Sequence, residues 1–278
     1  MVDFEFRDHY DCNDLLRIVR ILRHPGGCPW DAAQTHESLR RCFLEEACEA
    51  VEAIDLQNDA LLREELGDVL LQVVFHASLA EDEGKFTLDD VADGVCKKMI
   101  FRHPHVFGAA EPGSAEEALQ NWDALKRAEK GQETCTDALE AVARTLPGLW
   151  RAEKLLKKAA GAGFTWREIG SALDKLSEET EELRRAVAED SNVFEELGDV
   201  LFAAAGVARF AGVDPEAALH AACEKYISRF SHVERGAAAQ QRKLDELPLE
   251  EMVRLWNEAK TEEKHTTQSN EQEDNEHE

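Results

Sequence analysis

This sequence of 278 residues has no C-x-x-C motif, and we expect no export signal in it. The chain has seven cysteines, an odd number, and none of them forms a C-x-x-C pair. This usage argues against a disulfide framework or a cysteine zinc site and favours reduced thiols. The first eleven residues are acidic and polar, whereas a signal peptide is basic and then apolar. We therefore expect a cytoplasmic protein.

Positive charge is also scarce. Lys and Arg total 32 against 58 Asp and Glu, which gives a formal net charge of −26 at pH 7. Such a chain would repel a phosphate backbone or an anionic bilayer, so we expect neither nucleic acid nor a membrane as a partner. The most apolar stretches, residues 70–80 and 200–213, are interrupted by Gln72, His76 and Arg209. Neither reaches the roughly 20 apolar residues of a membrane-spanning helix.

Strand-like alternation is not apparent, and only seven prolines occur. Apolar residues instead recur with helical spacing, at i, i+3, i+4 and i+7, over residues 15–22, 39–54 and 62–77. Thr87 offers an N-cap for a further helix over residues 88–99. The pattern predicts an all-α protein with short connections between its helices.

The sequence repeats itself in order. The heptapeptide E-E-L-G-D-V-L occurs at residues 64–70 and again at 195–201. Three further motifs have two copies each: E-E-x-x-E at 45–49 and 178–182, K-x-x-x-R-x-x-H-V at 98–106 and 225–233, and W-x-x-x-K at 122–126 and 256–260. Conserved order with small changes in loop length predicts a tandem duplication of one four-helix unit.

This duplication predicts two domains, residues 1–130 and 137–264. The polar, glycine-led segment 131–136 is the expected boundary between them. Residues 265–278 contain no apolar side chain, so we expect an acidic, disordered tail there.

Carboxylates gather at matching positions in the two halves. In each half, one Glu pair and one Glu/Asp pair sit three residues apart on successive helices, so each pair shares a helix face. If the helices form an antiparallel hairpin, both pairs come face to face, because their positions centre on residue 57 in the first half and on residue 189 in the second. The candidate metal ligands are Glu46, Glu49, Glu65 and Asp68, and Glu179, Glu182, Glu196 and Asp199.

Four converging carboxylates repel one another unless a cation neutralises them. Oxygen ligands alone suit Mg²⁺, with Mn²⁺ as a substitute, and this is the usual arrangement in phosphate chemistry. The alternative is that an acid-rich chain produces E-x-x-E by chance on a solvated face. Two copies at the same hairpin register favour the metal site.

Cations and an aromatic residue follow the second carboxylate set. Lys225 and Arg229 are four residues apart and could grip a polyphosphate, or form surface ion pairs with Glu224 or Glu234. Trp256 could stack on a nucleobase or pack in the interior, and the sequence leaves both open.

These residues resemble the MazG family. The resemblance covers about residues 12–264. In the first half it includes G-C-P-W-D at 27–31, Q-T at 34–35 and R-H-P-H-V-F at 102–107. In the second half it includes G-F-T-W at 163–166, K-x-x-E-E at 175–179 and E-E-L-G-D at 195–199. The resemblance implies Mg²⁺-dependent hydrolysis of nucleoside triphosphates to the monophosphate and pyrophosphate, with the metal held by the carboxylates identified above.

The resemblance also implies roles for single residues. Those expected to face the nucleotide are Lys175, Glu178, Lys225, Arg229, Trp256 and Lys260; Lys98 and Arg102 are the first-half counterparts of Lys225 and Arg229. Glu178 is the first candidate for activating the attacking water, with Glu195 as the second. The first half has Cys42 where the second has Lys175, so we expect the second half to be the active one. An uncovered apolar face on each hairpin also leads us to expect a homodimer.

Two other functions are considered. A di-iron carboxylate bundle needs E-x-x-H twice, but this chain has it only at Glu262 and His265. A non-catalytic helical regulator that senses nucleotides or binds a protein stays open, above all for the first half.

Overall fold

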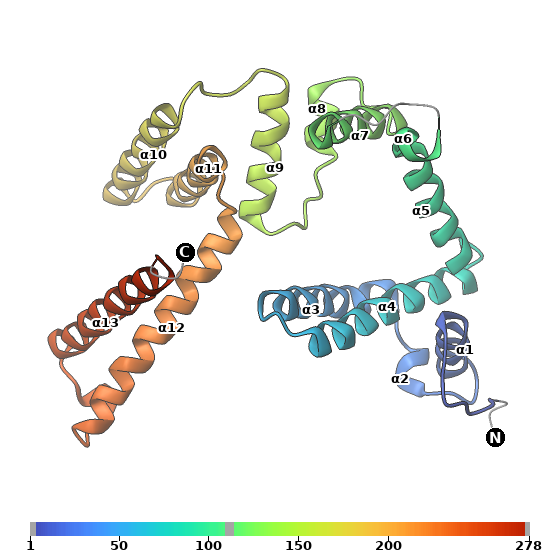
Figure 1. Ribbon diagram of the computed structural model, residues 1–278, viewed down its shortest axis with the longest axis horizontal. Coiled ribbons are helices and arrows are strands. Elements are labelled where there is room, and N and C mark those ends of the chain that lie inside the picture. Colours follow the sequence, from blue (N-terminus) through green and yellow to red (C-terminus); the bar gives the residue numbers. More distant parts are fainter. Residues whose placement is uncertain (1–3, 109–113, 276–278) are drawn as a thin grey trace. The chain divides into compact units, whose positions relative to one another are not determined.

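The computed structural model describes residues 4–108 and 114–275, and within these ranges every regular element is helical (Figure 1). This confirms the predicted all-α class. The chain divides into two compact units, Met1–Lys126 and Arg127–Glu278. The division falls a few residues before the polar segment 131–136 that the sequence suggests as a boundary.

The first unit is built around a helical hairpin. Its helices are α1 (Cys12–Arg23), α2 (Pro29–Ala32), α3 (His36–Asp55), α4 (Asp59–Asp82), α5 (Leu88–Arg102), α6 (Pro104–Phe107) and α7 (Ala115–Glu129), whose last residues belong to the second unit. Local capping explains where the helices begin. The side chains of Thr35, Asn58 and Thr87 each accept a hydrogen bond from a backbone N–H in the first turn of the helix that follows. The capping role predicted for Thr87 is thus confirmed.

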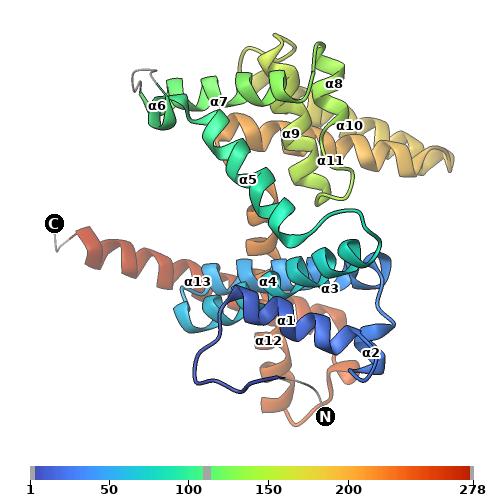
Figure 2. The same cartoon turned by 90° about the vertical axis from the view of Figure 1, so that its right-hand side faces the viewer.

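Helix α1 packs along α4 and fixes one side of the α3–α4 hairpin (Figure 2). The buried core there consists of Val19, Leu39, Val74, Phe75 and Leu79. Two ion pairs tie the rim of this contact: Arg20 donates to both Glu81 carboxylate oxygens, and Arg23 Nη2 lies 2.7 Å from Asp82 Oδ2. The close packing of α1 against α4 therefore stabilises the α3–α4 hairpin and the positions of the carboxylate residues that it carries.

The second unit repeats the hairpin and adds a second one. Its helices are α8 (Cys135–Glu140), α9 (Gly148–Gly161), α10 (Ile169–Glu189), α11 (Val193–Ala211), α12 (Pro215–Ala239), the 3₁₀ turn η1 (Leu244–Glu246) and α13 (Leu249–Asn275). Asp190 and Asn192 have positive φ angles of 51° and 43° and reverse the chain between α10 and α11. These residues are ones that tolerate the left-handed region well. The reversal follows directly after residue 189, on which the second-half carboxylate positions are centred.

Helix α10 packs along α11, α9 packs on α11 and α12, and α12 packs along α13 (Figure 1). The core of the α12–α13 hairpin contains Val233, Ala237, Leu247 and Leu255, with Trp256 packed against it. A Cβ atom at Gly236 would lie 2.7 Å from Leu255 Cδ2, so a larger residue there would have to displace this core side chain.

Helix α13 runs to Asn275, and the disordered tail expected over residues 265–278, the last three of which lie outside the described residues, stays a prediction. Glu and Gln are good helix formers, and extending an existing helix needs no new nucleus. No helix in the described part of the chain is both long and apolar enough to cross a bilayer.

Candidate active site

The second-half carboxylates converge on the α10–α11 hairpin. Oxygens of Glu179 on α10 and of Glu196 and Asp199 on α11 all lie within 4.8 Å of one another. Glu179 is buried, with 7% of its surface exposed, and Asp199 is exposed. The hairpin thus brings three of the four expected ligands together, with oxygen donors only. Such a donor set fits a hard divalent cation.

Glu182, the fourth expected ligand, lies outside this group of three. Its carboxylate accepts a hydrogen bond of 3.3 Å from Arg185 Nη2. Its charge still acts on the group. The pKa of Glu196 is raised first by burial and then by the negative charges of Glu182 and Asp199. Glu182 therefore lies at the edge of the cluster.

A cation already touches the second-half cluster. Lys175 Nζ lies 2.7 Å from Glu179 Oε1 and 2.8 Å from Glu178 Oε1. These hydrogen bonds, with Glu178 as the larger cause, raise the pKa of Lys175 above its ordinary range. The family resemblance leads us to expect that Lys175 and Glu178 face the nucleotide. In the structure Lys175 contacts Glu178 and also Glu179, a candidate metal ligand.

The first half also brings three of its four expected ligands together, but a different three, and without the lysine. Oxygens of Glu46, Glu49 and Glu65 lie within 4.8 Å of one another on α3 and α4. Asp68 lies outside this group, yet its charge contributes to the environment of both Glu46 and Glu65. Burial is the largest cause that raises the pKa of Glu46 and of Glu65, and neighbouring carboxylates add to it. A position matching Lys175 is held by Cys42, a half-buried free thiol.

The other cations expected to face the nucleotide lie on the α12–α13 hairpin of the same unit: Lys225, Arg229 and Lys260. Arg229 on α12 pairs with Glu263 on α13 at 2.7 Å, and its guanidinium lies 5.7 Å from the centre of the Trp256 ring. The pairing with Glu224 or Glu234 that the sequence offers is therefore not the one formed. Lys225 and Lys260 are exposed. Within the described ranges, no hydrogen bond or ion pair joins the α10–α11 cluster to any of the four residues expected to face the nucleotide from α12 and α13: Lys225, Arg229, Trp256 and Lys260.

Trp256 is half-buried, because one side packs on the α12–α13 core and Tyr226 lies 5.0 Å from its ring centre. The packing role that the sequence leaves open is thus observed for part of the ring. A matching contact exists in the first unit, where the guanidinium of Arg102 lies 5.1 Å from the centre of the Trp122 ring. The repeated Arg–Trp contact belongs to the duplicated unit.

The two candidates for water activation have different surroundings. Glu178 is exposed, and its carboxylate is engaged by Lys175. Glu195 is exposed in the first turn of α11, and its charge contributes to the raised pKa of Glu196. Both lie next in sequence to a member of the cluster, so the geometry leaves both in contention.

Sequence reasoning missed a histidine pair that joins α3 and α4 in the first half. His36 Nδ1 and His76 Nδ1 are 2.8 Å apart, with ring planes 7° from parallel. Burial, followed by the charge of His36, lowers the pKa of His76. Gln72, one turn before His76 on α4, is buried, and its Oε1 has no hydrogen-bond partner. The hairpin register of the carboxylates pairs His76 with residue 38, two residues from His36, so the sequence carried no direct signal for this contact.

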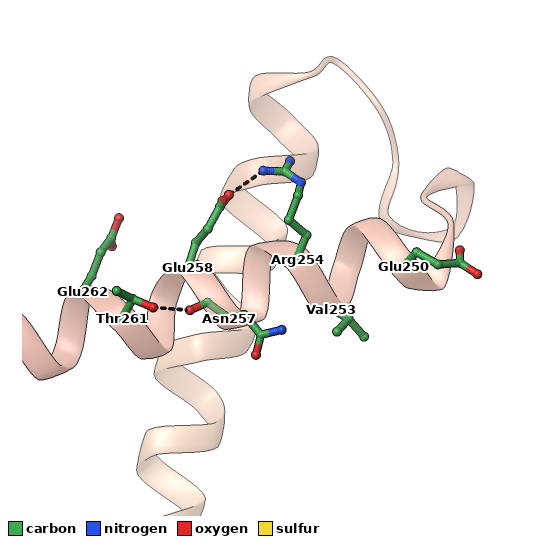
Figure 3. Close-up of a pocket in the computed structure, with 7 residues that line it drawn as sticks. All are labelled: Glu250, Val253, Arg254, Asn257, Glu258, Thr261 and Glu262. Carbon is green, nitrogen blue, oxygen red and sulfur yellow. Dashed lines mark hydrogen bonds and ion pairs between the residues drawn. The ribbon is translucent and has the colours of Figure 1, made fainter.

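A surface hollow on α13 contains none of the expected site residues (Figure 3). Its lining comes from one face of a single helix, as the spacing of Glu250, Arg254, Asn257 and Thr261 shows. Hydrogen bonds within the helix occupy several of these side chains, such as that from Thr261 Oγ1 to Asn257 O at 2.9 Å. This surface does not enclose a ligand.

Comparison with known proteins adds a relationship to this geometry. A family model described as the MazG nucleotide pyrophosphohydrolase domain matches residues 34–107 and 167–234. The nucleoside triphosphate pyrophosphohydrolase/pyrophosphatase MazG of Thermotoga maritima is 40% identical over 247 residues, covering 89% of this chain and 94% of that protein. The nucleoside triphosphate pyrophosphohydrolase of Escherichia coli is 40% identical over 254 residues, covering 90% and 97%. An uncharacterized Bacillus subtilis protein, YabN, is 44% identical over 255 residues, covering 91% of this chain and 52% of that protein.

Proposed function

Because this chain belongs to the MazG nucleotide pyrophosphohydrolase family, we propose that it carries out its hydrolysis at the α10–α11 carboxylate cluster of its second half. The chain is a nucleoside triphosphate pyrophosphohydrolase, a hydrolase of an acid anhydride. The observation that carries the choice of half is the meeting of Glu179, Glu196 and Asp199 beside the cation of Lys175. The first half offers carboxylates without that cation.

The cation that we propose is Mg²⁺, with Mn²⁺ as a substitute. Its ligands would be Glu179, Glu196 and Asp199, joined by Glu182 from the edge of the cluster. Bound there, the ion would polarise the α-phosphate and neutralise charge that develops on the leaving pyrophosphate. An all-carboxylate set supports Mg²⁺ or Mn²⁺ over zinc, which prefers nitrogen and sulfur donors.

The side chains of α12 and α13 would grip the polyphosphate and the base. Lys225 and Lys260 are exposed and available to phosphate oxygens, whereas Arg229 must first leave Glu263. Once Arg229 moves, one face of Trp256 is uncovered for stacking on a base of any kind. The α12–α13 face has to meet the α10–α11 cluster for this, either by closure of the unit or through a second copy of the chain.

Water activation is assigned to Glu178 first and Glu195 second. Glu178 would hold the proton of the attacking water if Lys175 turned away from it toward a phosphate. Glu195 is an exposed alternative on the opposite helix of the hairpin. Each lies next to a candidate metal ligand, where a general base has to be.

We also propose that the chain acts as a homodimer. The α10–α11 hairpin exposes a set of large apolar side chains: Phe194, Leu197, Leu201 and Phe202. An exposed apolar patch of this kind on a helical hairpin supports a partner surface, and closed two-fold pairing is the commonest form of assembly. A cytoplasmic location is proposed as well, supported by seven free cysteines.

Product analysis tests the proposed function. Incubation with mixed nucleoside triphosphates and Mg²⁺ should yield monophosphates and pyrophosphate, resolved by ion-exchange chromatography. A diphosphate with orthophosphate would contradict cleavage between the α and β phosphates. The absence of any turnover would favour the non-catalytic regulator, the second candidate, which the first half supports because Cys42 replaces the lysine.

A further inference from the structure

The two carboxylate clusters differ in one built-in charge. Lys175 Nζ contacts Glu179, a buried member of the second-half cluster, at 2.7 Å. Because the repeat places Cys42 at the corresponding position, the first-half cluster has no such lysine. The cation nearest in sequence, Arg41, hydrogen-bonds Glu45 rather than a member of the cluster.

We propose that Lys175 is an internal counterion that must leave Glu179 before a divalent cation can bind there, so that the first-half cluster binds metal without nucleotide and the second-half cluster binds it together with a triphosphate. The proposal rests on the metal site of the proposed function and adds a mode of regulation to it. A triphosphate would supply the new partner of Lys175.

The physical basis of the proposal is competition between the Lys175 ammonium and a metal ion for the Glu179 carboxylate. An ammonium at 2.7 Å satisfies a lone pair of the Glu179 carboxylate and offsets part of the repulsion within the cluster. A metal ion that recruits this oxygen must first displace the ammonium, which lowers its apparent affinity. In the first-half cluster, the carboxylates of Glu46 and Glu65 lie within 4.8 Å of each other and the matching position holds Cys42, so no lysine offsets their repulsion in this way.

The lysine is also able to move. Its side chain is about one third exposed, at 35%, and it has a flexible four-carbon stem. Glu178, which is exposed, offers a second anchor at 2.8 Å. Lys175 can therefore release Glu179 without losing every partner, and a phosphate oxygen can replace both carboxylates.

Metal binding without nucleotide tests the proposal separately from hydrolysis. The probe is Mn²⁺, followed by the electron paramagnetic resonance signal of the free ion. Glu65→Gln disables the first cluster and leaves the second to be measured alone. In that background we expect Lys175→Met to tighten Mn²⁺ binding by about tenfold or more, because the competing charge is gone. A non-hydrolysable triphosphate analogue should tighten binding in the Lys175 protein far more than in the Met variant.

The reciprocal variant and a charge control complete the design. In a Glu196→Gln background, which leaves only the first cluster, Cys42→Lys should weaken Mn²⁺ binding by a similar factor. Lys157→Met on α9 removes the same charge from an exposed position and should leave the affinity unchanged. Circular dichroism of each variant is the control that checks whether it stays helical.

The possible outcomes distinguish failure of the counterion role from failure of the proposed metal site. An unchanged Mn²⁺ affinity in Lys175→Met, with Mg²⁺-dependent pyrophosphate release intact in the wild type, would overturn the counterion role alone. An equal gain in Lys157→Met would overturn it too, since net charge would then be the cause. Failure of either cluster to bind Mn²⁺ in any variant would overturn it together with the metal site.

Discussion

Replacing Glu179 by Gln should abolish most turnover, whereas the matched change Glu46→Gln should leave most of it. Glu179 is 7% exposed and is shared between the carboxylate cluster and Lys175. Removing one preorganised charge contact to the reacting group typically costs about 3 kcal/mol. At about 1.4 kcal/mol for each factor of ten, kcat should fall by about two orders of magnitude. The change is conservative in volume, so the fold should persist.

Steady-state kcat at saturating Mg²⁺ and nucleotide is the measurement, with pyrophosphate release as the signal. Glu46→Gln is the matched control, because it occupies the same position of the other hairpin and should lower kcat by less than about threefold. Thermal unfolding of both variants checks that they are folded. Equal loss in the two variants, or greater loss in Glu46→Gln, would refute the assignment of the active half.

Excess EDTA should remove the activity and Mg²⁺ or Mn²⁺ should restore it, while Zn²⁺ should not; activity that survives EDTA would contradict a metal mechanism. The lowered pKa of His76, below its ordinary 6.5, means that the unfolded chain binds more protons in acid, so stability is full above about pH 6.5 and falls as the pH drops through it. Urea unfolding at pH 7.5 and 5.5 should show this loss in the wild type and less of it in His76→Phe; an equal loss would assign it elsewhere. Val74→Ala, at a fully buried position, should lower the free energy of unfolding by about 2 kcal/mol, measured by hydrogen exchange of α4. Val213→Ala, at an exposed position, should lower it by almost nothing. Equal losses in the two variants would contradict the core described for the first unit.

Much of the candidate site follows from spacing along the chain. Carboxylates three residues apart share a helix face, and a short polar turn sets which residues of two antiparallel helices lie opposite. For this reason the convergence of Glu179 with Asp199, and of Glu49 with Glu65, can be predicted without coordinates. Helical periodicity and the Thr87 cap are equally local, so the all-α class could be predicted in the same way.

Contacts between side chains that have several possible partners could not be predicted in this way. Arg229 has acidic neighbours on its own helix, yet it pairs with Glu263 on α13, because the packing of two helices brings that carboxylate closer. The Nδ1 atoms of His36 and His76 meet 2.8 Å apart, although the hairpin register would pair His76 with residue 38, two residues from His36. Side-chain length and rotamer choice decide such contacts, and neither is encoded in periodicity.

The sequence by itself determined the helical class, the duplication and the four carboxylate positions of each hairpin, because each follows from residues near in the chain or from repetition. Only the tertiary structure decided which three carboxylates gather closely, that Lys175 rests on Glu179 in the second half, and that Arg41 pairs with Glu45, outside the cluster, in the first. The physical reason is that a carboxylate's partner depends on distances of a few ångströms across packed helices, where small shifts change which charge is nearest.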